Sequence, residues 1–206
     1  MARKRSEFLK GFGKAFEILK ALTDAVLKRG GSDQDMERIL TSKILRDKLA
    51  DLICEIVQTA KNIFRVPVNY NQNVQDMVKA GKYDWVNSDI NGTNFPVIRR
   101  GEEMAEVHLI HFNRDITSEE ALLELDKMGF KPEELPGLLA LGAQHPELQR
   151  EYPIAALGSV WRYRFGGRGV PCLYGDGSGR DLDLSWFGGS WDADWRFAAV
   201  RKPACR

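Results

Sequence analysis

The sequence has few cysteines, almost no net charge and no long apolar run. Its three cysteines, Cys54, Cys172 and Cys205, are widely spaced and form no Cys-x-x-Cys pair. That spacing argues against a disulfide framework and a structural zinc site, and it favours a reducing compartment. The formal net charge of +1 gives no overall reason to expect nucleic acid or a membrane as the partner. Without an apolar run long enough for a secretory signal or a membrane span, we expect no membrane partner and a protein that is cytoplasmic or part of a virion assembled in the cytoplasm.

The N-terminal part of the chain has the period of amphipathic helices. Apolar side chains recur at intervals of three and four over residues 8–26, and "RGGS" then ends the pattern. A second stripe of the same period covers residues 36–56, and Ser32 or Asp33 is placed to cap it. The pattern therefore predicts two helices joined by a Gly-Gly turn.

From two helices joined by a short turn, we predict an antiparallel helical hairpin over residues 1–64. Its apolar faces need another surface, so we expect a second copy or a partner helix to bind through residues 5–60. The first helix is also basic, with an excess of positive side chains: Arg3, Lys4, Arg5, Lys10, Lys14, Lys20, Lys28 and Arg29 against Glu7, Glu17 and Asp24. A solvated helix face explains this charge, and a face that binds phosphate or docks a partner is the alternative.

The rest of the chain, residues 65–206, has short elements of both kinds. "AEVHLIHF" alternates like a strand, and Thr117-x-x-Glu120 is a capping box that opens a helix. A second short helix is expected around "LPGLLALGAQ". Four later segments have strand patterns between Gly-rich turns: "PIAALGSVWRYRF", "GVPCLY", "DLDLSWF" and "WRFAAVRK". The predicted fold class is α+β, in which the helical hairpin precedes a domain of short mixed and antiparallel strands with two helices.

The order of these segments resembles the C-type-lectin fold as bacteria and phages use it. There a first helix ends near a glycine, a Leu-Pro segment starts the second helix, a tryptophan opens the ligand-side strands and a terminal strand closes the sheet. The matching positions here are Gly129, Leu135, Pro136, Leu138, Leu139, Trp161, Arg196, Phe197, Val200 and Arg201. The segments "YDWVNSDINGTNFP", "HFNRDITSEEAL" and "LGSVWRYR" also resemble a bacterial family with many paralogous copies, whose tails differ after "ALGSVW".

A lectin-like fold with a varying tail is similar to the variable proteins of diversity-generating retroelements. In that family adenines are replaced at random, so Asn codons become almost any residue except Lys, Gln, Glu, Met and Trp. The chain has 13 Lys, 14 Glu, 6 Gln and 5 Met, yet residues 162–194 contain none of them. Diversification predicts this depletion. A Gly-rich β tail that avoids helix-favouring residues explains it equally well, and both interpretations stay open.

Tryptophan is concentrated in the same tail. Diversified Asn codons cannot give tryptophan, so on that reading Trp161, Trp186 and Trp191 form a fixed, buried frame. Trp195 fits less well, because it lies where a variable residue could be.

The positions between the tryptophans are small, polar or aromatic, as in a paratope. We predict that they bind a protein or another macromolecule: Arg162, Arg164, Tyr174, Asp176, Ser178, Arg180, Asp181, Asp183, Ser185, Phe187, Ser190, Asp192 and Asp194. In "DLDLSW" the alternation puts Asp181, Asp183 and Ser185 on one face and the leucines on the other. The leucine face should be buried, and the aspartate face should meet the ligand.

Patterns for catalysis or metal binding are weak. His108 and His111 should face opposite sides of a strand, and "DGSGRDLD" lacks the calcium ligands of an EF-hand loop. Cys172 has no expected neighbour except Cys205. We therefore expect no catalytic residue, no metal and no cofactor. The predicted function is ligand recognition, and the alternative is a nucleic-acid-associated accessory protein that uses the basic first helix.

Overall fold

The computed structural model describes residues 17, 19–51, 62–164 and 166–203. The chain divides into two compact units, residues 1–59 and 60–206. The division falls a few residues before the predicted boundary, because residues from Ile63 onward already pair in a sheet of the second unit.

The described part of the first unit is mostly helical. Its helical segments are residues 19–28, α2 (Asp33–Thr41) and residues 43–51. Ser32 begins α2, as predicted, and its N–H and hydroxyl both donate to the Asp35 carboxylate at 2.8 Å. The second predicted helix is interrupted at Ser42, which has extended backbone angles and whose hydroxyl accepts from the Leu45 N–H. Serine favours such a local hydrogen bond over a continuous helix.

Every side chain described between residues 19 and 51 is at least partly exposed. Large apolar side chains are among them, and Ile44 is 69% exposed. The amphipathic faces predicted from the sequence are therefore not covered within the described part of this unit.

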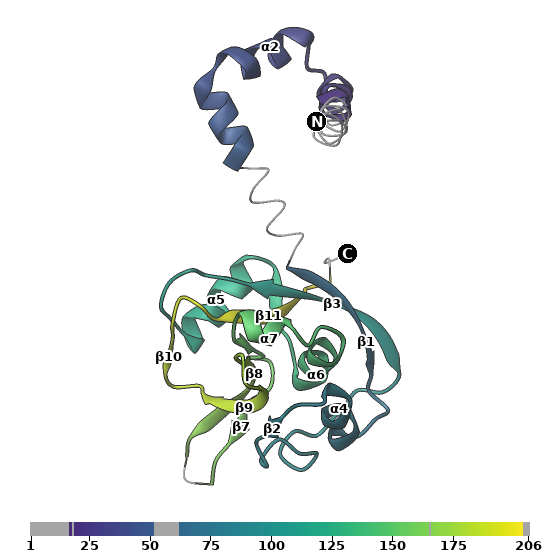
Figure 1. Ribbon diagram of the computed structural model, residues 1–206, viewed down its shortest axis with the longest axis vertical. Coiled ribbons are helices and arrows are strands. Elements are labelled where there is room, and N and C mark those ends of the chain that lie inside the picture. The colour runs from purple at the N-terminus through teal and green to yellow at the C-terminus, as the bar shows by residue number, and fades with distance from the viewer. Residues whose placement is uncertain (1–16, 18, 52–61, 165, 204–206) are drawn as a thin grey trace, which may run out of the picture. The chain divides into compact units, whose positions relative to one another are not determined.

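The second unit is a mixed α+β domain built on one large sheet (Figure 1). The strands in their order across the sheet are β1 (Ile63–Asn69), β3 (Glu102–Ile110), β11 (Arg196–Arg201), β6 (Ile154–Ala155), β8 (Arg168–Gly175), β9 (Arg180–Trp186) and β2 (Trp85–Val86). Two short strands attach at the side: β5 (Phe130–Pro132) pairs with β11, and β7 (Trp161–Arg162) pairs with β8. A separate two-stranded sheet joins β4 (Ile116–Thr117) to β10 (Ser190–Trp191).

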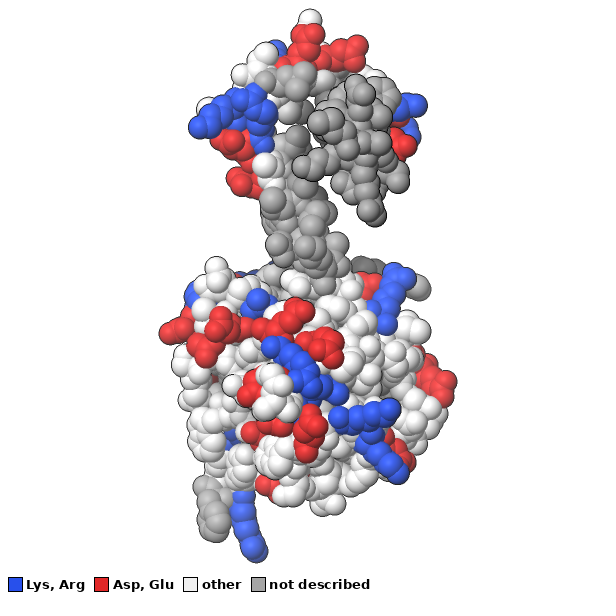
Figure 2. All heavy atoms as spheres, in the orientation of Figure 1, with Lys and Arg blue, Asp and Glu red and all other residues white. Residues whose placement is uncertain are grey.

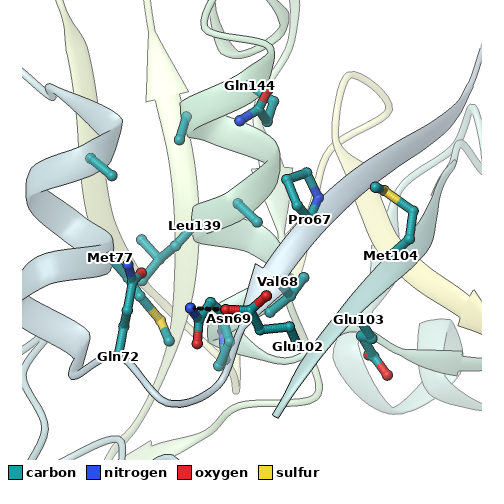
Figure 3. Close-up of a pocket in the computed structure, with 14 residues that line it drawn as sticks. Pro67, Val68, Asn69, Gln72, Met77, Glu102, Glu103, Met104, Leu139 and Gln144 are labelled. Atoms are coloured by element: carbon teal, nitrogen blue, oxygen red, sulfur yellow. Dashed lines mark hydrogen bonds between the residues drawn. The ribbon is translucent and has the colours of Figure 1, made fainter.

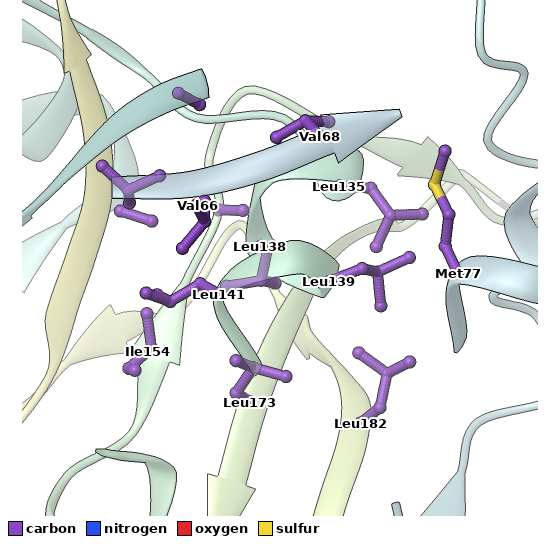
Figure 4. Close-up of a cluster of buried hydrophobic side chains, with 14 of the residues drawn as sticks. Val66, Val68, Met77, Leu135, Leu138, Leu139, Leu141, Ile154, Leu173 and Leu182 are labelled. Atoms are coloured by element: carbon purple, nitrogen blue, oxygen red, sulfur yellow. The ribbon is translucent and has the colours of Figure 1, made fainter. Parts of the chain in front are cut away.

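One face of the large sheet holds the main core. The helices of this unit are α4 (Val74–Gly81), α5 (Ser118–Lys127), α6 (Leu135–Gln144) and α7 (Leu148–Glu151). Helix α6 is apolar all round, as a helix enclosed by protein must be, and it lies between β1 and β8 (Figure 1). Figure 4 shows its leucines packed between two sets of sheet residues: Val66 and Val68 on β1, and Ile154, Leu173 and Leu182 on β6, β8 and β9. This core fixes the position of β8 and β9.

The other face of the sheet is covered only in part. Helix α5 and the β4–β10 pair pack over β11, β6 and the start of β8, with Phe197, Val170 and Trp191 in a second cluster. The glycine that ends α5, Gly129, has φ +79°, a conformation that glycine adopts without strain. On this second face, α5 and the β4–β10 pair do not extend over the rest of β8, β9 and β2.

The helix predicted over "SEEALLELDKMG" is confirmed as α5, two residues shorter at its end, and the helix predicted around "LPGLLALGAQ" is confirmed as α6. The capping box is confirmed as well, because Thr117 and Glu120 each accept from the other's backbone N–H. The prediction of two helices in this domain was wrong, because α4 and α7 were missed. α7 has four residues, too few for a helical period to appear. α4 is short as well, and buries only Val74 and Met77 besides a glycine.

Candidate functional site

The candidate site is the uncovered part of the second face, which we call the open face. Its residues come from β2, β7, β8, β9 and the position after β2: Trp85, Asn87, Arg162, Tyr174, Asp181, Asp183 and Ser185. The register explains the arrangement, because residues paired across strands project to the same side. Asp181 pairs with Tyr174 on one side and with Trp85 on the other. Asp181, Asp183 and Ser185 therefore share one face, as predicted, and each is half-buried, whereas the alternating Leu182 is fully buried.

Asp183 is held in place from two sides. One carboxylate oxygen accepts from the Asn87 side-chain amide at 2.8 Å and from the Leu184 N–H at 2.7 Å. The side-chain oxygen of Asn87, Oδ1, accepts in turn from the Asp89 N–H at 3.0 Å. This chain of hydrogen bonds fixes the rotamer of a half-buried acceptor before any ligand arrives.

Sequence reasoning missed Trp85 and Asn87. They reach the site through a parallel pairing of β2 with β9, which joins segments almost a hundred residues apart. The one local signal is "YDWVNSD", where a single tryptophan stands among polar residues; half of its surface is exposed.

The prediction that Arg180 contacts the ligand was wrong. Its guanidinium is buried on the leucine face, where it donates to the Gly81 and Gly142 carbonyls at 2.8 and 2.7 Å and to the Gln149 side-chain oxygen at 3.0 Å. Gly81 and Gly142 lie at or near the C-terminal ends of α4 and α6, where free carbonyls favour a cation. Arg180 therefore ties β9 to these helices.

Phe187 was also wrongly predicted as a ligand contact. It is 4% exposed and packs in the cluster beneath α5, with the Arg168 guanidinium 3.8 Å from its ring centroid. Phe187 lies on the same side of the sheet as Ser185, but at this end α5 and the β4–β10 pair cover that side.

The remaining predicted residues do not converge on the open face. Asp176 and Ser178 form the β8–β9 turn, in which the Asp176 carboxylate accepts from the Ser178 and Gly179 N–H groups. Ser190 on β10 pairs with Thr117 on β4, the residue just before α5. In the loop after β10, the Asp192 carboxylate accepts from the Asp194 N–H. These residues are exposed, as is Arg164 in the β7–β8 turn. We expected Arg162, Arg164, Tyr174, Asp176, Arg180, Asp183, Phe187 and Asp194 to converge on one solvent-facing patch, and this was wrong. Of the predicted positions, only Arg162, Tyr174, Asp181, Asp183 and Ser185 share the open face.

The tryptophans also divide into two kinds. Trp191 is buried at 2% exposure, and its indole N–H donates to the Ser118 hydroxyl at 2.8 Å. Trp186 is 57% exposed, so its predicted place in a buried frame was wrong. It stacks on Tyr163, with centroids 6.3 Å apart, and lies so close to Gly167 that a Cβ there would come within 2.4 Å of the indole. Trp161 is half-buried, and so is Trp195, which packs edge-on against Trp191.

A groove of about 570 Å³ lies elsewhere, between α4, α6 and the β1–β3 pair (Figure 3). Its walls are largely apolar, with Pro67, Met77 and Leu139 among them. Among its polar side chains, the Asn69 amide donates to the Glu102 carboxylate at 2.6 Å, and Glu103 accepts from Tyr70 and Arg99.

A hollow of about 310 Å³ near β3 and β5 collects titratable side chains. Burial raises the pKa of Glu133, whose carboxylate accepts from the Glu134 N–H, and burial lowers the pKa of His108, although its contact with Glu106 opposes the shift. Neither side chain hydrogen-bonds to a Ser, Thr or Cys in the described part of the chain. These groups therefore lack the nucleophile–base pairing of a catalytic site.

Cys172 pairs with Asp183 and projects from β8 to the same side as the open face, but it is 3% exposed, so the sheet is covered at this position. Burial, with the nearby Asp183 charge, raises the pKa of its thiol to about 12. At neutral pH the thiol stays protonated, and a protonated thiol is a poor nucleophile. Cys205, its one expected neighbour, lies outside the described residues.

Residues 17, 19–51, 62–164 and 166–203 contain no cluster of three or more His, Cys, Asp or Glu side chains that could hold a metal ion. Among the same residues, no helix is long and apolar enough to cross a membrane. The most basic part of the predicted first helix lies outside what the structure describes. Over the second unit, Figure 2 shows acidic and basic atoms intermixed, with acidic atoms gathered where Figure 1 labels α5.

The fold and the site together define a class: a mixed α+β protein whose sheet leaves part of one face open to solvent. No protein-family model, curated protein or solved structure matches the chain. What the protein does is therefore inferred from the open face itself.

Proposed function

We propose that the second unit is a C-type-lectin-like recognition domain, as in the variable proteins of diversity-generating retroelements, and that its open face binds a protein or another macromolecule without catalysis. The order of elements supports this. α5 ends at Gly129, α6 begins with Leu135 and Pro136, Trp161 opens the short strand β7, and Arg196–Arg201 pairs inside the sheet as β11.

One observation supports the binding role most strongly. The two faces of β9 differ in kind: Leu182 is fully buried in the main core, while Asp181 and Ser185 on the opposite face keep solvent access. Side chains on such a face can change without altering the core, because the strand is held by its other side and by the ladder to β8. A diversified surface needs this separation of structure from recognition.

The composition of the tail agrees with the proposal. The tail without Lys, Gln, Glu and Met, residues 162–194, contains β8, β9 and the turn before them, which supply most of the open face. Asp, Ser and Tyr are all accessible from Asn codons by adenine replacement. If the tail is diversified, many of the replaced side chains would therefore lie on a surface that a ligand can contact.

A display experiment tests the proposal. Two libraries of the full chain are made, one randomised at Arg162, Tyr174, Asp181 and Ser185, and a control randomised at Asp176, Ser178, Asp192 and Asp194. Both are selected for binding to immobilised ubiquitin as a defined protein probe. We expect folded binders from the open-face library alone, because its positions share one surface while the control positions occupy separate turns. Equal yields from both libraries, or an open-face library that does not fold, would contradict the proposal.

A further inference from the structure

One row of the open face consists of side chains without partners. Trp85, Asp181 and Tyr174 are aligned across β2, β9 and β8 by the register of the sheet. Both aromatic residues are 50% exposed, and the aspartate between them is half-buried. In the described part of the chain, neither ring has an aromatic or cationic neighbour, and the Asp181 carboxylate makes no hydrogen bond or ion pair. We call these three residues the aromatic–acid row.

The rest of the domain shows what usually covers an aromatic ring here. The guanidinium of Arg99 lies 4.2 Å from the Tyr70 centroid, and that of Arg196 lies 4.6 Å from the Tyr152 centroid. Arg99 also donates to the Glu103 carboxylate at 2.6 Å, so one guanidinium is held by a ring and a carboxylate together. The aromatic–acid row has the rings and the carboxylate of such a site, but no cation.

The spacing of the row fits a planar cation. Neighbouring strands lie about 4.8 Å apart, so the backbones of Trp85 and Tyr174 are separated by about 10 Å, with Asp181 midway. A cation bound to the Asp181 carboxylate would therefore stand between the two aromatic side chains, and a ring attracts a cation within roughly 6 Å of its centroid.

We propose that the aromatic–acid row binds an arginine side chain of a protein partner. This inference rests on the recognition function proposed above and names the chemistry of its ligand. A guanidinium is planar, can bond a carboxylate through two N–H groups and stacks on aromatic faces, whereas the compact lysine ammonium does this less well. Asp183, in the next row, adds negative charge. The two carboxylates repel phosphate, so this end of the face does not suit nucleic acid.

The positive charges nearby do not fill the site. Arg180 is adjacent in sequence, but its guanidinium is buried on the opposite face of the sheet. The Arg168 guanidinium stacks on Phe187 and forms an ion pair with Glu119 at 3.1 Å. Arg162 is the strand neighbour of Arg168, so it lies at the far end of the open face. Under the proposed diversification Tyr174 and Asp181 would vary and Trp85 would not, so the preference for arginine would belong to this sequence alone.

Amide NMR of the full chain tests the inference, with acetyl-arginine amide as the probe and acetyl-citrulline amide as its neutral counterpart. We expect saturable shifts of the Trp85 indole and of the Tyr174 and Asp181 amides, with a dissociation constant in the millimolar range. Citrulline should give no saturable shift. Asp181→Asn and Trp85→Ala should each weaken binding by at least about fivefold. Asp194→Asn, which removes the same charge from a separate loop, should not.

Equal shifts with arginine and citrulline, or equal weakening by Asp181→Asn and Asp194→Asn, would overturn the arginine site. Failure of this titration while the open-face library still yields ubiquitin binders would refute the arginine preference and leave the recognition function intact. Failure of the library as well would remove the recognition function.

Discussion

At the residue scale, exposure separates side chains that hold the fold from those available to a ligand. The two kinds alternate closely in the tail: Arg180 is buried and Asp181 is not, and Trp191 is buried while Trp186 is not. Residue type alone does not predict this division, because an arginine can serve the core and a tryptophan can serve the surface.

The two tryptophans allow a matched test of this division. We expect Trp191→Ala to lower the free energy of unfolding by about 3–5 kcal/mol, because it removes a buried indole and its bond to Ser118. Trp186→Ala should cost about 1 kcal/mol or less, since more than half of that side chain is already in water. Urea denaturation followed by circular dichroism measures both. Similar losses would mean that Trp186 is part of the frame after all.

Glu133 should make stability depend on pH. Burial raises its folded-state pKa above the ordinary 4.5, so the folded protein keeps a proton that the unfolded chain releases. The free energy of unfolding therefore falls as pH rises from about 4.5 through the raised pKa. Glu133→Gln removes this contribution, and its stability relative to wild type should increase over that range and then level off. Urea midpoints from pH 4 to 8 check this; a constant difference between the proteins would contradict it.

At the element scale, the strands β8 and β9 are positioned by what lies behind them. The core helix α6 supports their leucine face, and Arg180 joins β9 to the ends of α4 and α6. Gln149 on α7 donates to the Tyr174 and Asp181 carbonyls at 2.6 and 3.0 Å, so it bridges the two strands. Contacts on the reverse side of the sheet thus hold the strands of the open face in position.

Removal of the Arg180 guanidinium tests this support. Arg180→Ala leaves the carbonyls of Gly81 and Gly142 without their donor, and we expect a loss of about 2–4 kcal/mol in the free energy of unfolding. Arg162→Ala, which removes an exposed arginine from the open face, should change it by about 0.5 kcal/mol at most. Chemical denaturation of the two variants distinguishes them, and equal effects would argue against the structural role of Arg180.

Strand alternation predicted much of the site, and its failures have physical causes. Asp181, Asp183 and Ser185 were placed on the exposed face by a period of two, and the same period puts Arg180 with the leucines, a signal that was present but overlooked. Phe187 lies on the same side of the sheet as Ser185, but packing under α5 buries it. Trp85 joins the site through a pairing distant in sequence, which no local pattern reveals.

At the scale of the whole molecule, the two units differ in how well they bury apolar surface. The second unit has a continuous core, whereas the described helices of the first unit leave Ile44 and other large apolar side chains exposed. Such helices are stable when a partner covers them. The sequence-based expectation of a second copy or a partner helix therefore stays a prediction.

We expect the chain to self-associate through the first unit at tens of micromolar. Ile44→Glu should reduce the association, because it places a charge on the uncovered helical surface. Ile98→Glu, at an isoleucine 87% exposed on the second unit, is the control and should leave it unchanged. Light scattering measures both variants. A monomeric wild-type chain, or an equal effect of the control, would show that the first unit does not mediate self-association.

Sequencing of the DNA around the coding region tests the central claim most directly. If the open face is a diversified recognition surface, a near-identical repeat of the segment for residues 162–194 should lie nearby, beside a reverse-transcriptase gene. Its differences from the coding copy should be adenine replacements in the codons for Tyr174, Asp181 and Ser185, and the buried Leu182 and Trp191 should be unchanged. The absence of such a repeat, or differences concentrated in the codons of buried residues, would contradict the account.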